Sequence, residues 1–450
     1  MSHKTYLITA AVAGAEPNWR FLTCLAAYAK HRDAEVLVAT LPGLHKNDVV
    51  DVRIAADFGA TLVDTSLSLG RNLSLLQFRL RPAQQNPLVS LSRFIQNKKS
   101  AIIPSTKQFF QPVATMTSDP RVFYTTGACT EPAYADSRIG EIATFDHVIG
   151  AVVVECGHDG LFHARPLRWK KGTCFTDIGS QVSYFGKGAV QFKQVQAKVV
   201  TLGDWHTGDT DPVARSASFD MLHQFEPRTT VVHDIFNGHS INHHEQDKCI
   251  TRAREHRNGR LDLPAELLEC AKELEEISRW IPARGRLLVS KSNHDDWLAR
   301  YLESGHYNDD PQNYRLALTL AAALYDGQDP LEAAVRSMAK LPHVSFLHRK
   351  HGINILGWEV GEHGDAGVNG SKGNTAQLER VAGHAVIGHQ HTPSIFRGLV
   401  VVGTNTKLQL GYNEKSPSTW LHANSVIWPD GSCQLLVMPE QRACKWTYFT

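Results

Sequence analysis

Five polar clusters hold the side chains of this chain that are best suited to metal chemistry. They are Gly203-Asp204-Trp205-His206, Asp234, Asn293-His294-Asp295, Gly361-Glu362-His363-Gly364-Asp365 and Gly388-His389-Gln390-His391. Of the 23 histidines in the chain, 16 fall between His206 and His391, which is less than half of its length. Carboxylate, imidazole and amide oxygen suit Mn, Fe or Zn, and no thiolate among them demands a softer metal. One D-x-H pair arises often by chance, so it is the order of the five clusters that predicts a metal site.

The elements that must position these clusters are short apolar runs, each of which stops at a polar cluster. These runs are Ala197–Leu202, Thr229–Val232, Arg286–Val289, Ile355–Val360 and Ala385–Ile387. Open α/β folds bind ligands at the carboxyl ends of such strands. Helical patterns lie between them at Pro264–Trp280, Leu316–Tyr325 and Pro330–Leu341. The tail from about 395 to 446 alternates apolar and polar residues around a Pro429-Asp430-Gly431 turn, which predicts β-hairpins.

The first 195 residues predict a separate α/β unit. Tyr6–Ala15 and Ala34–Leu41 are typical of strands, and Trp19–Lys30 between them is typical of a helix. A short secretory signal is the alternative interpretation of the first segment. The Gly-rich segment Phe185–Ala189 is expected to be a junction. We therefore expect an N-terminal α/β domain of unknown role over 1–195 and a second domain over 196–450, with a helical insertion around 306–355.

Composition limits the class of protein. The chain has 450 residues, 42% of them hydrophobic and 20% charged, with a formal net charge of +2, which suits a globular protein in water and does not by itself indicate nucleic-acid binding. No run reaches the roughly 18 apolar residues of a membrane span, so we expect no membrane partner. Eight cysteines occur without a C-x-x-C pair, which favours reduced thiols and a cytoplasmic location.

The order D-x-H, D, N-H-D, H and H-x-H over about residues 197–450 resembles the calcineurin-like metallophosphoesterases, which include the SbcD-like DNA repair nucleases. The resemblance implies an α/β (α+β) chain whose C-terminal domain has four layers in the order α/β/β/α. It implies two divalent metal ions, with Mn²⁺ preferred and Fe, Zn or Mg as alternatives. Carried over by motif, Asp204, His206 and His391 would hold one ion. Asn293, His363 and His389 would hold the other, and Asp234 would bridge both.

The resemblance also assigns a catalytic role to His294, which would stabilise the developing charge or protonate the leaving oxygen. Two positions depart from the family pattern. Ser292 stands where the family usually has Gly, which is tolerable if the backbone does not need a positive φ. Asn237 stands where Ser/Thr protein phosphatases have Asp, which argues against that role. The loop from Asn237 through His239, His243 and His244 is either a substrate-binding rim or an ordinary polar loop.

The expected substrate is DNA. Arg252–Arg257 with Arg260, and His348–His351, could neutralise backbone phosphates, although solvated surface charge explains each run equally well. The phrases Glu362–Asp365, Gly367–Gly373 and Ser416–Trp420 resemble bacteriophage phosphoesterases, such as the host-DNA-degrading enzymes of T5-like phages, which would act in the host cytoplasm. The alternatives are a nucleotide or small-molecule phosphatase or phosphodiesterase, and an inactive scaffold with this fold. Self-association into a homo-oligomer is left open.

Overall fold

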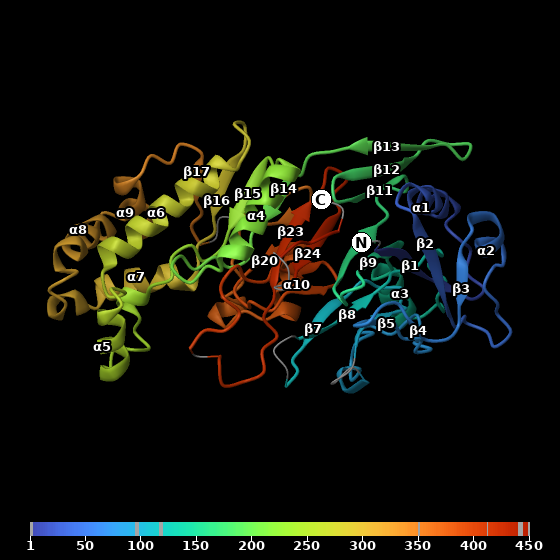
Figure 1. Ribbon diagram of the computed structural model, residues 1–450, viewed down its shortest axis with the longest axis horizontal. Helices are drawn as coiled ribbons and strands as arrows, with labels where there is room; N and C mark the ends of the chain where they lie inside the picture. The colour runs from blue at the N-terminus through green and yellow to red at the C-terminus, as the bar shows by residue number, and fades with distance from the viewer. Residues whose placement is uncertain are drawn as a thin grey trace.

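The computed structural model describes residues 3–94, 99–116, 120–349, 352–411, 413–439 and 444–448. The molecule is elongated, with a helical region at one end, sheets through the middle and the first strands and helices at the other end (Figure 1). The two ends of the chain meet, because the rings of His3 and Tyr448 stack 5.6 Å apart. The mixed α/β class expected from the sequence is confirmed. None of the helices in the described ranges has both the length and the apolar character that a bilayer span requires.

The first segment of the chain is a buried strand, as predicted. Strand β1 (Lys4–Val12) lies parallel to β2 (Ala34–Leu41) and antiparallel to β9 (Gly150–Cys156) in a five-stranded sheet, and helix α1 (Trp19–His31) connects it to β2. The sheet is completed by β3 (Thr61–Val63) and β10 (Phe162–Arg168). Helix α2 (Arg53–Phe58) packs on it through Ile54, and α3 (Arg138–Phe145) precedes β9 in the chain.

The prediction that Phe185–Ala189 is a junction is wrong. This segment is the turn between β12 (Ser180–Tyr184) and β13 (Val190–Gln194), which form a three-stranded sheet with β11 (Cys174–Asp177). The backbone N–H of Phe185 donates to the carbonyl of Ala189 at 2.8 Å, and Gly186 and Gly188 supply the positive φ values of the turn. A glycine-rich segment is as compatible with the turn of a β-hairpin as with a linker between domains.

A six-stranded sheet carries most of the predicted cluster-bearing strands. Its order is β17 (Val344–Phe346), β16 (Arg286–Val289), β15 (Thr229–Val232), β14 (Val199–Thr201), β23 (His422–Ile427) and β24 (Cys433–Met438). The first four are mutually parallel, β23 runs antiparallel to β14, and β24 runs antiparallel to β23. One face shares an apolar core with α4 (Pro212–Phe225), α6 (Leu263–Arg279), α7 (Asn293–Glu303), α8 (Tyr314–Tyr325) and α9 (Pro330–Met338).

A ten-stranded sheet joins the two halves of the chain. Its order is β18 (Asn354–Ile355), β19 (Trp358–Glu359), β20 (Ala385–Ile387), β22 (Leu399–Val401), β21 (Ser394–Phe396), β7 (Phe110–Val113), β8 (Arg121–Thr125), β6 (Ser100–Ile103), β5 (Leu73–Leu75) and β4 (Leu67–Ser68). Strands β21 and β7 pair through Ile395 and Phe110. The predicted boundary near residue 195 is therefore not a boundary between sheets, and the division into two domains stays a prediction.

The two large sheets face each other across a shared core. Val231 and Leu288 of the six-stranded sheet belong to the same buried apolar cluster as Val386 and Val400 of the ten-stranded sheet. On the outer side of the ten-stranded sheet, a small cluster packs against Leu378 of α10 (Thr375–Ala382). The packing order at the site is thus helix, sheet, sheet, helix. The segment 306–355 holds the 3-10 turn η3 (His306–Asp309), α8 and α9, together with β17.

Candidate metal centre

Strand ends bring the five clusters together. Strand β14 ends two residues before Gly203, β15 ends directly before His233, and β16 ends four residues before Asn293. Strand β20 ends directly before Gly388, and its parallel neighbour β19 ends shortly before His363. Parallel strands present their carboxyl ends at one edge of a sheet, so these loops converge.

Four of the predicted ligands form one buried group. The ligand atoms of Asp204, His206, Asp234 and His391 all lie within 4.8 Å of one another. The Nε2 atoms of His206 and His391 are 3.1 Å apart. The Nε2 atom of His391 is 3.2 Å from Oδ2 of Asp204, and that of His206 is 3.4 Å from Oδ2 of Asp234. Two imidazole nitrogens and two carboxylates therefore point at one small volume.

Asp234 also faces the other predicted set of ligands. Its Oδ2 atom is 3.1 Å from Nε2 of His363, whose ring centroid lies 5.3 Å from that of His389. Asn293 is the first residue of helix α7 and is half-buried. Asp234 thus touches His206 on one side and His363 on the other, which is the placement expected of a bridging ligand.

The unsatisfied atoms of this cluster fit a cation. Oδ2 of Asp204, Oδ1 of Asp234, Oδ1 of Asn293 and Nε2 of His363 are all buried and have no hydrogen-bond partner in the described residues. Buried polar atoms are nearly always paired, and leaving one unpaired costs about 1–3 kcal/mol. His206 and His391 approach each other at hydrogen-bond distance, but these four atoms have no hydrogen-bond partner in the described residues. Divalent ions would satisfy them.

The backbone at the cluster is strained. His206, Asp234, His389 and His391 have φ values of 46°, 49°, 72° and 54°. Residues other than glycine seldom adopt this left-handed region, and each instance costs on the order of 1–3 kcal/mol unless the surroundings enforce it. Such strain concentrates at functional sites. Four of the seven predicted ligands have this left-handed backbone conformation.

Charge at the cluster is set by burial and by close opposite charges. Burial raises the pKa of Asp204, but contact with His391 outweighs this and lowers it to about 2. Burial lowers the pKa of His206 to about 3. Burial opposes protonation of His363, yet the charge of Asp234 raises its pKa to about 9. The carboxylates therefore stay ionised and draw positive charge into the site.

His294 lies beside this group with its tautomer fixed. Its ring centroid is 4.7 Å from that of His206, and its Nδ1–H donates to the backbone carbonyl of Asn237 at 2.6 Å. The opposite ring nitrogen, Nε2, is left for other contacts. Ser292 caps helix α7 with φ of −111°, so the serine that replaces the usual glycine is tolerated, as expected. Its side chain and that of Asp295 form a capping box.

The predicted rim residues are divided between two environments. Asn237 is buried, and its side-chain amide donates to Oδ2 of Asp209 at 2.9 Å. His239 contacts the same carboxylate oxygen at 2.7 Å, and although burial lowers its pKa, Asp209 raises it overall. Asn237 and His239 thus lie behind His294, held by an internal carboxylate. Their predicted contact with substrate stays a prediction.

His243 and His244 lie on the outer side, around Trp297. Their ring centroids are 5.1 and 5.6 Å from that of Trp297, which itself stacks on His294 at 4.0 Å. The Nη1 atom of Arg300 is 3.1 Å from Nε2 of His243. An aromatic and basic surface therefore extends outward from the predicted catalytic histidine.

Several residues at the site were not predicted. Asp209 follows Asp204 by five positions. His233 directly precedes Asp234, and its Nδ1 atom lies 3.3 Å from Nδ1 of His363. Trp420 packs its ring 4.2 Å from that of His391. The second aspartate of the sequence D-W-H-T-G-D could have identified Asp209 as a residue of the site. Nothing in the sequence distinguished His233 or Trp420 from core residues.

The arginine of the basic phrase His348–His351 is engaged by two carboxylates. Arg349 is paired with Asp365 at 2.6 Å and with Asp296 at 2.8 Å, and so ties α7 to the loop that carries His363. Both carboxylates engage Arg349, so it is less available to a backbone phosphate than its sequence suggests, and the contact of this basic phrase with DNA stays a prediction. Lys350 and His351 lie outside the described residues.

Comparison with known proteins adds a relative but no family. No protein-family model matches the chain. Protein A1 of Escherichia phage T5 is 26% identical over an alignment of 465 positions, which covers 96% of this chain and 81% of that protein. Among solved structures, Vps29 of Chaetomium thermophilum with a bound cyclic peptide covers 43% of this chain and 96% of its own, at 11% identity and a TM-score of 0.24, too low to carry an argument. The chain is therefore similar over nearly its whole length to a phage protein, which makes a phage origin plausible.

Proposed function

We propose that this protein is a metal-dependent phosphodiesterase of the calcineurin-like kind that hydrolyses DNA. The observation that carries the proposal is the buried group of Asp204, His206, Asp234 and His391, whose ligand atoms lie within 4.8 Å of one another. Asp204, His206 and His391 would hold one divalent ion. Asn293, His363 and His389 would hold a second, with Asp234 shared. Mn²⁺ is the metal that the resemblance favours, and the oxygen and imidazole donors also suit Fe or Zn.

The proposed reaction is hydrolysis at a phosphodiester. Divalent ions in this site would polarise the phosphate oxygens and lower the pKa of a water molecule that attacks phosphorus. The residues of the chain supply orientation and a proton. Because Nδ1–H of His294 is committed to the Asn237 carbonyl, Nε2 is the atom that would deliver a proton to the leaving oxygen. Asp209 holds the Asn237 side chain at 2.9 Å and so keeps this carbonyl in place.

The start of helix α7 adds to phosphate binding. Asn293 and His294 are its first two residues, and the helix runs for 11 residues to Glu303. The backbone N–H groups of a first helical turn, with the helix dipole, favour an anion at that end. A phosphate beside His294 would face them.

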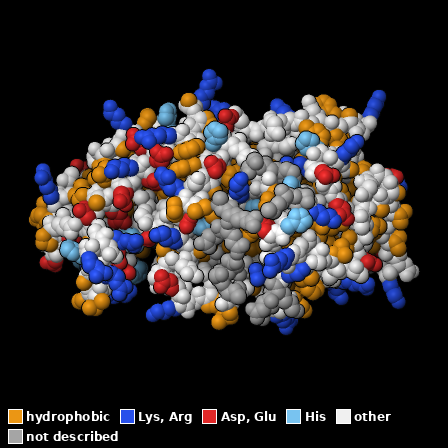
Figure 2. Space-filling model, in the orientation of Figure 1, with side chains coloured by type: hydrophobic (Ala, Val, Ile, Leu, Met, Phe, Trp, Pro, Cys, Tyr) orange, Lys and Arg blue, Asp and Glu red, His pale blue; other side chains and the backbone are white. Residues whose placement is uncertain are grey.

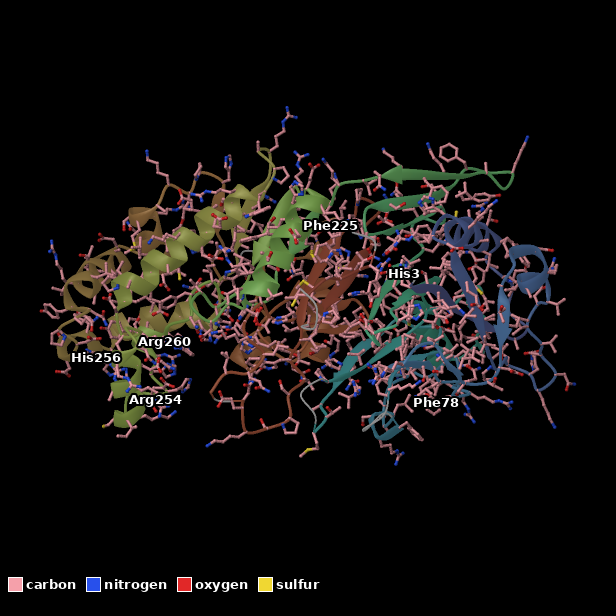
Figure 3. All side chains as sticks on the ribbon, in the orientation of Figure 1. His3, Phe78, Phe225, Arg254, His256 and Arg260 are labelled. Carbon is pink, nitrogen blue, oxygen red and sulfur yellow. The ribbon has the colours of Figure 1, made fainter. Side chains whose placement is uncertain are left out.

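The surface beside the site favours a polymeric nucleic acid over a small phosphate ester. Trp297 stacks on His294 and is flanked by His243 and His244, and base–aromatic stacking contributes about 1–3 kcal/mol per base. Helix α5 (Cys249–Arg257) follows this loop and carries exposed Arg254 and Arg257. Figure 2 shows Lys and Arg side chains gathered at the lower left of the molecule, and Figure 3 shows Arg254, His256 and Arg260 there. A strand bound across the site would meet this basic helix.

The test is an activity panel with purified full-length protein. Single-stranded DNA, duplex DNA, RNA, nucleotides and bis(p-nitrophenyl) phosphate are each incubated with Mn²⁺, Mg²⁺ or Zn²⁺. We expect DNA cleavage with Mn²⁺ and its loss in Asp234→Asn and His294→Ala. Asp220→Asn and His343→Ala, which alter exposed residues away from the cluster, should retain the activity.

Three outcomes contradict the proposal in different ways. Hydrolysis of nucleotides or bis(p-nitrophenyl) phosphate with all DNA intact would show a small-substrate phosphodiesterase. Cleavage of RNA but not of DNA would show that the substrate is RNA. Protein that binds no divalent ion and hydrolyses nothing would be an inactive scaffold.

A further inference from the structure

A second cavity lies away from the metal centre, where the two halves of the chain meet. Its volume is about 410 Å³, within the range of roughly 300–1,000 Å³ typical of small-molecule sites. Its lining comes from the segments around β7, the end of α3 and the end of β10, and on the other side from α10 and the turn between β21 and β22. None of the predicted metal ligands lines it.

Two buried cations of this lining have no carboxylate within ion-pair distance in the described part of the chain. Lys107 is 1% exposed, and its ammonium group donates to the carbonyl of Pro82 at 2.8 Å. Arg168 is 8% exposed and donates through Nε to the amide oxygen of Gln108 at 3.0 Å and through Nη2 to the carbonyl of Arg397 at 3.2 Å. Among the described residues, no carboxylate lies within ion-pair distance of either. Buried charges are ordinarily paired, so a bound anion would supply the counter-ion that the described residues do not.

The remaining charges of the lining do not supply that counter-ion. Lys170 likewise has no carboxylate within 4.0 Å in the described part of the chain. The two acidic residues of the lining, Asp146 and Glu379, both face Arg397, at 3.4 and 3.6 Å. Four cationic side chains therefore line the cavity with two carboxylates, and both carboxylates are engaged by one of the four. Burial lowers the pKa of Lys107 to about 8, and the charge of Asp146, which lies beyond ion-pair distance, only partly offsets this.

The cavity also has an aromatic side. Phe145, at the end of α3, lines it and is 86% exposed, so its ring is available to a planar group. Trp169 lines it as well, and its indole Nε1–H is buried with no hydrogen-bond partner in the described residues. A ligand with an anionic end and a planar end that accepts a hydrogen bond would satisfy both sides.

We propose that this cavity binds a nucleoside monophosphate, with its phosphate at Lys107, Arg168 and Lys170 and its base at the aromatic side. A phosphate carries the charge and the acceptor oxygens that the three cations lack. A base supplies a flat ring for Phe145 and acceptor atoms for the indole N–H. The site is separate from the metal centre and does not depend on the function proposed there.

The test is calorimetric titration of the full-length protein in buffer with a chelator, so that no divalent ion is present at the metal centre. The titrants are deoxyadenosine monophosphate, inorganic phosphate and deoxyadenosine. We expect saturable binding of the monophosphate, tighter than that of either part alone. Lys170→Met should weaken it by about tenfold or more, since it removes one charge-assisted contact from a half-buried side chain. Lys171→Met, an exposed neighbour outside the lining, is the matched control and should bind as the wild type does.

Asp234→Asn separates this site from the metal centre, because it should bind the monophosphate unchanged whether or not the protein proves to be a nuclease. Loss of binding in this variant would place the nucleotide at the metal centre and overturn the proposal. So would an absence of saturable binding in the wild type, an equal effect of Lys171→Met, or monophosphate binding no tighter than phosphate. Thermal melting of each variant confirms that it is folded.

Discussion

Gly388 is a position where a single methyl group should disable the metal centre without removing a ligand. A Cβ added there would lie 2.9 Å from Cγ of His233, and closer still to Oδ1 of Asp204. That oxygen cannot simply turn away. It accepts the backbone N–H of His389 at 3.1 Å, and the other carboxylate oxygen lies 3.2 Å from Nε2 of His391. Gly388→Ala should therefore push Asp204 out of its position.

The size of the effect follows from the distances. Ordinary van der Waals contact between such atoms begins near about 3.5 Å, so His233 would have to retreat by more than about half an ångström and Asp204 by more. Catalytic groups must be held within about 0.5 Å, and a misplacement of about 1 Å can cost on the order of 100-fold in rate. We expect kcat/KM to fall by about 100-fold and Mn²⁺ affinity to fall with it.

The assay pairs calorimetric Mn²⁺ titration with hydrolysis of bis(p-nitrophenyl) phosphate and DNA. Gly411→Ala is the matched control, because an added Cβ there meets nothing within 4 Å and the backbone does not have positive φ. It should leave both properties unchanged. Wild-type Mn²⁺ affinity and rate in Gly388→Ala would refute the reasoning that this close approach holds the Asp204 carboxylate in place.

Three further predictions concern proton transfer, metal binding and acid stability. His294→Asn should lower kcat by about 10²–10⁴-fold with Mn²⁺ affinity unchanged, as measured by steady-state kinetics and calorimetry; an equal loss of affinity would show that His294 is a ligand instead. Mn²⁺ at about 100 times its dissociation constant should raise the free energy of unfolding by about 2.7 kcal/mol in the wild type, measured by chemical denaturation, and not in Asp234→Asn. Buried Glu155 and Asp177 contact Arg165 at 2.7 and 2.6 Å, and although burial opposes it, Arg165 lowers the pKa of both carboxyls. A carboxyl whose pKa is depressed in the folded protein stabilises the fold at pH values above its unfolded pKa, and this stabilisation is lost as the pH falls. The free energy of unfolding should therefore decrease as the pH is lowered from about 5, and it should decrease less steeply in Asp177→Asn. The same dependence of unfolding free energy on pH in both proteins would contradict this.

Local patterns were enough to place the strands that carry the site. Strands β15, β16 and β20 begin and end where their apolar runs do, because a buried parallel strand is a continuous apolar run that stops at the first polar residue. Helix α9 begins at Pro330 after the N-cap Asp329, as its sequence predicts. These signals span a few residues, so a sequence displays them directly.

Contacts between distant segments were not predictable in this way. Strand β7 pairs with β21 through Phe110 and Ile395, so strands from both sides of the predicted boundary near residue 195 belong to one sheet. Arg349 and Arg254 look alike in sequence, yet Arg349 is paired with two carboxylates and Arg254 is exposed. Whether a cation is paired depends on what folding brings beside it, and the sequence does not state this.

The sequence by itself determined which side chains could bind a metal and the order in which strands present them, since both depend on residue type and short spacing. The place of Asp234 between His206 and His363 was expected from the family resemblance, whereas only the tertiary structure decided that Asp209 holds the residue behind His294. It also decided that Lys107 and Arg168 are buried with no carboxylate of the described residues within ion-pair distance. The physical reason is that pairing and burial are properties of distances across the fold, and segments separated by a hundred residues or more acquire those distances only when the sheets close on a common core.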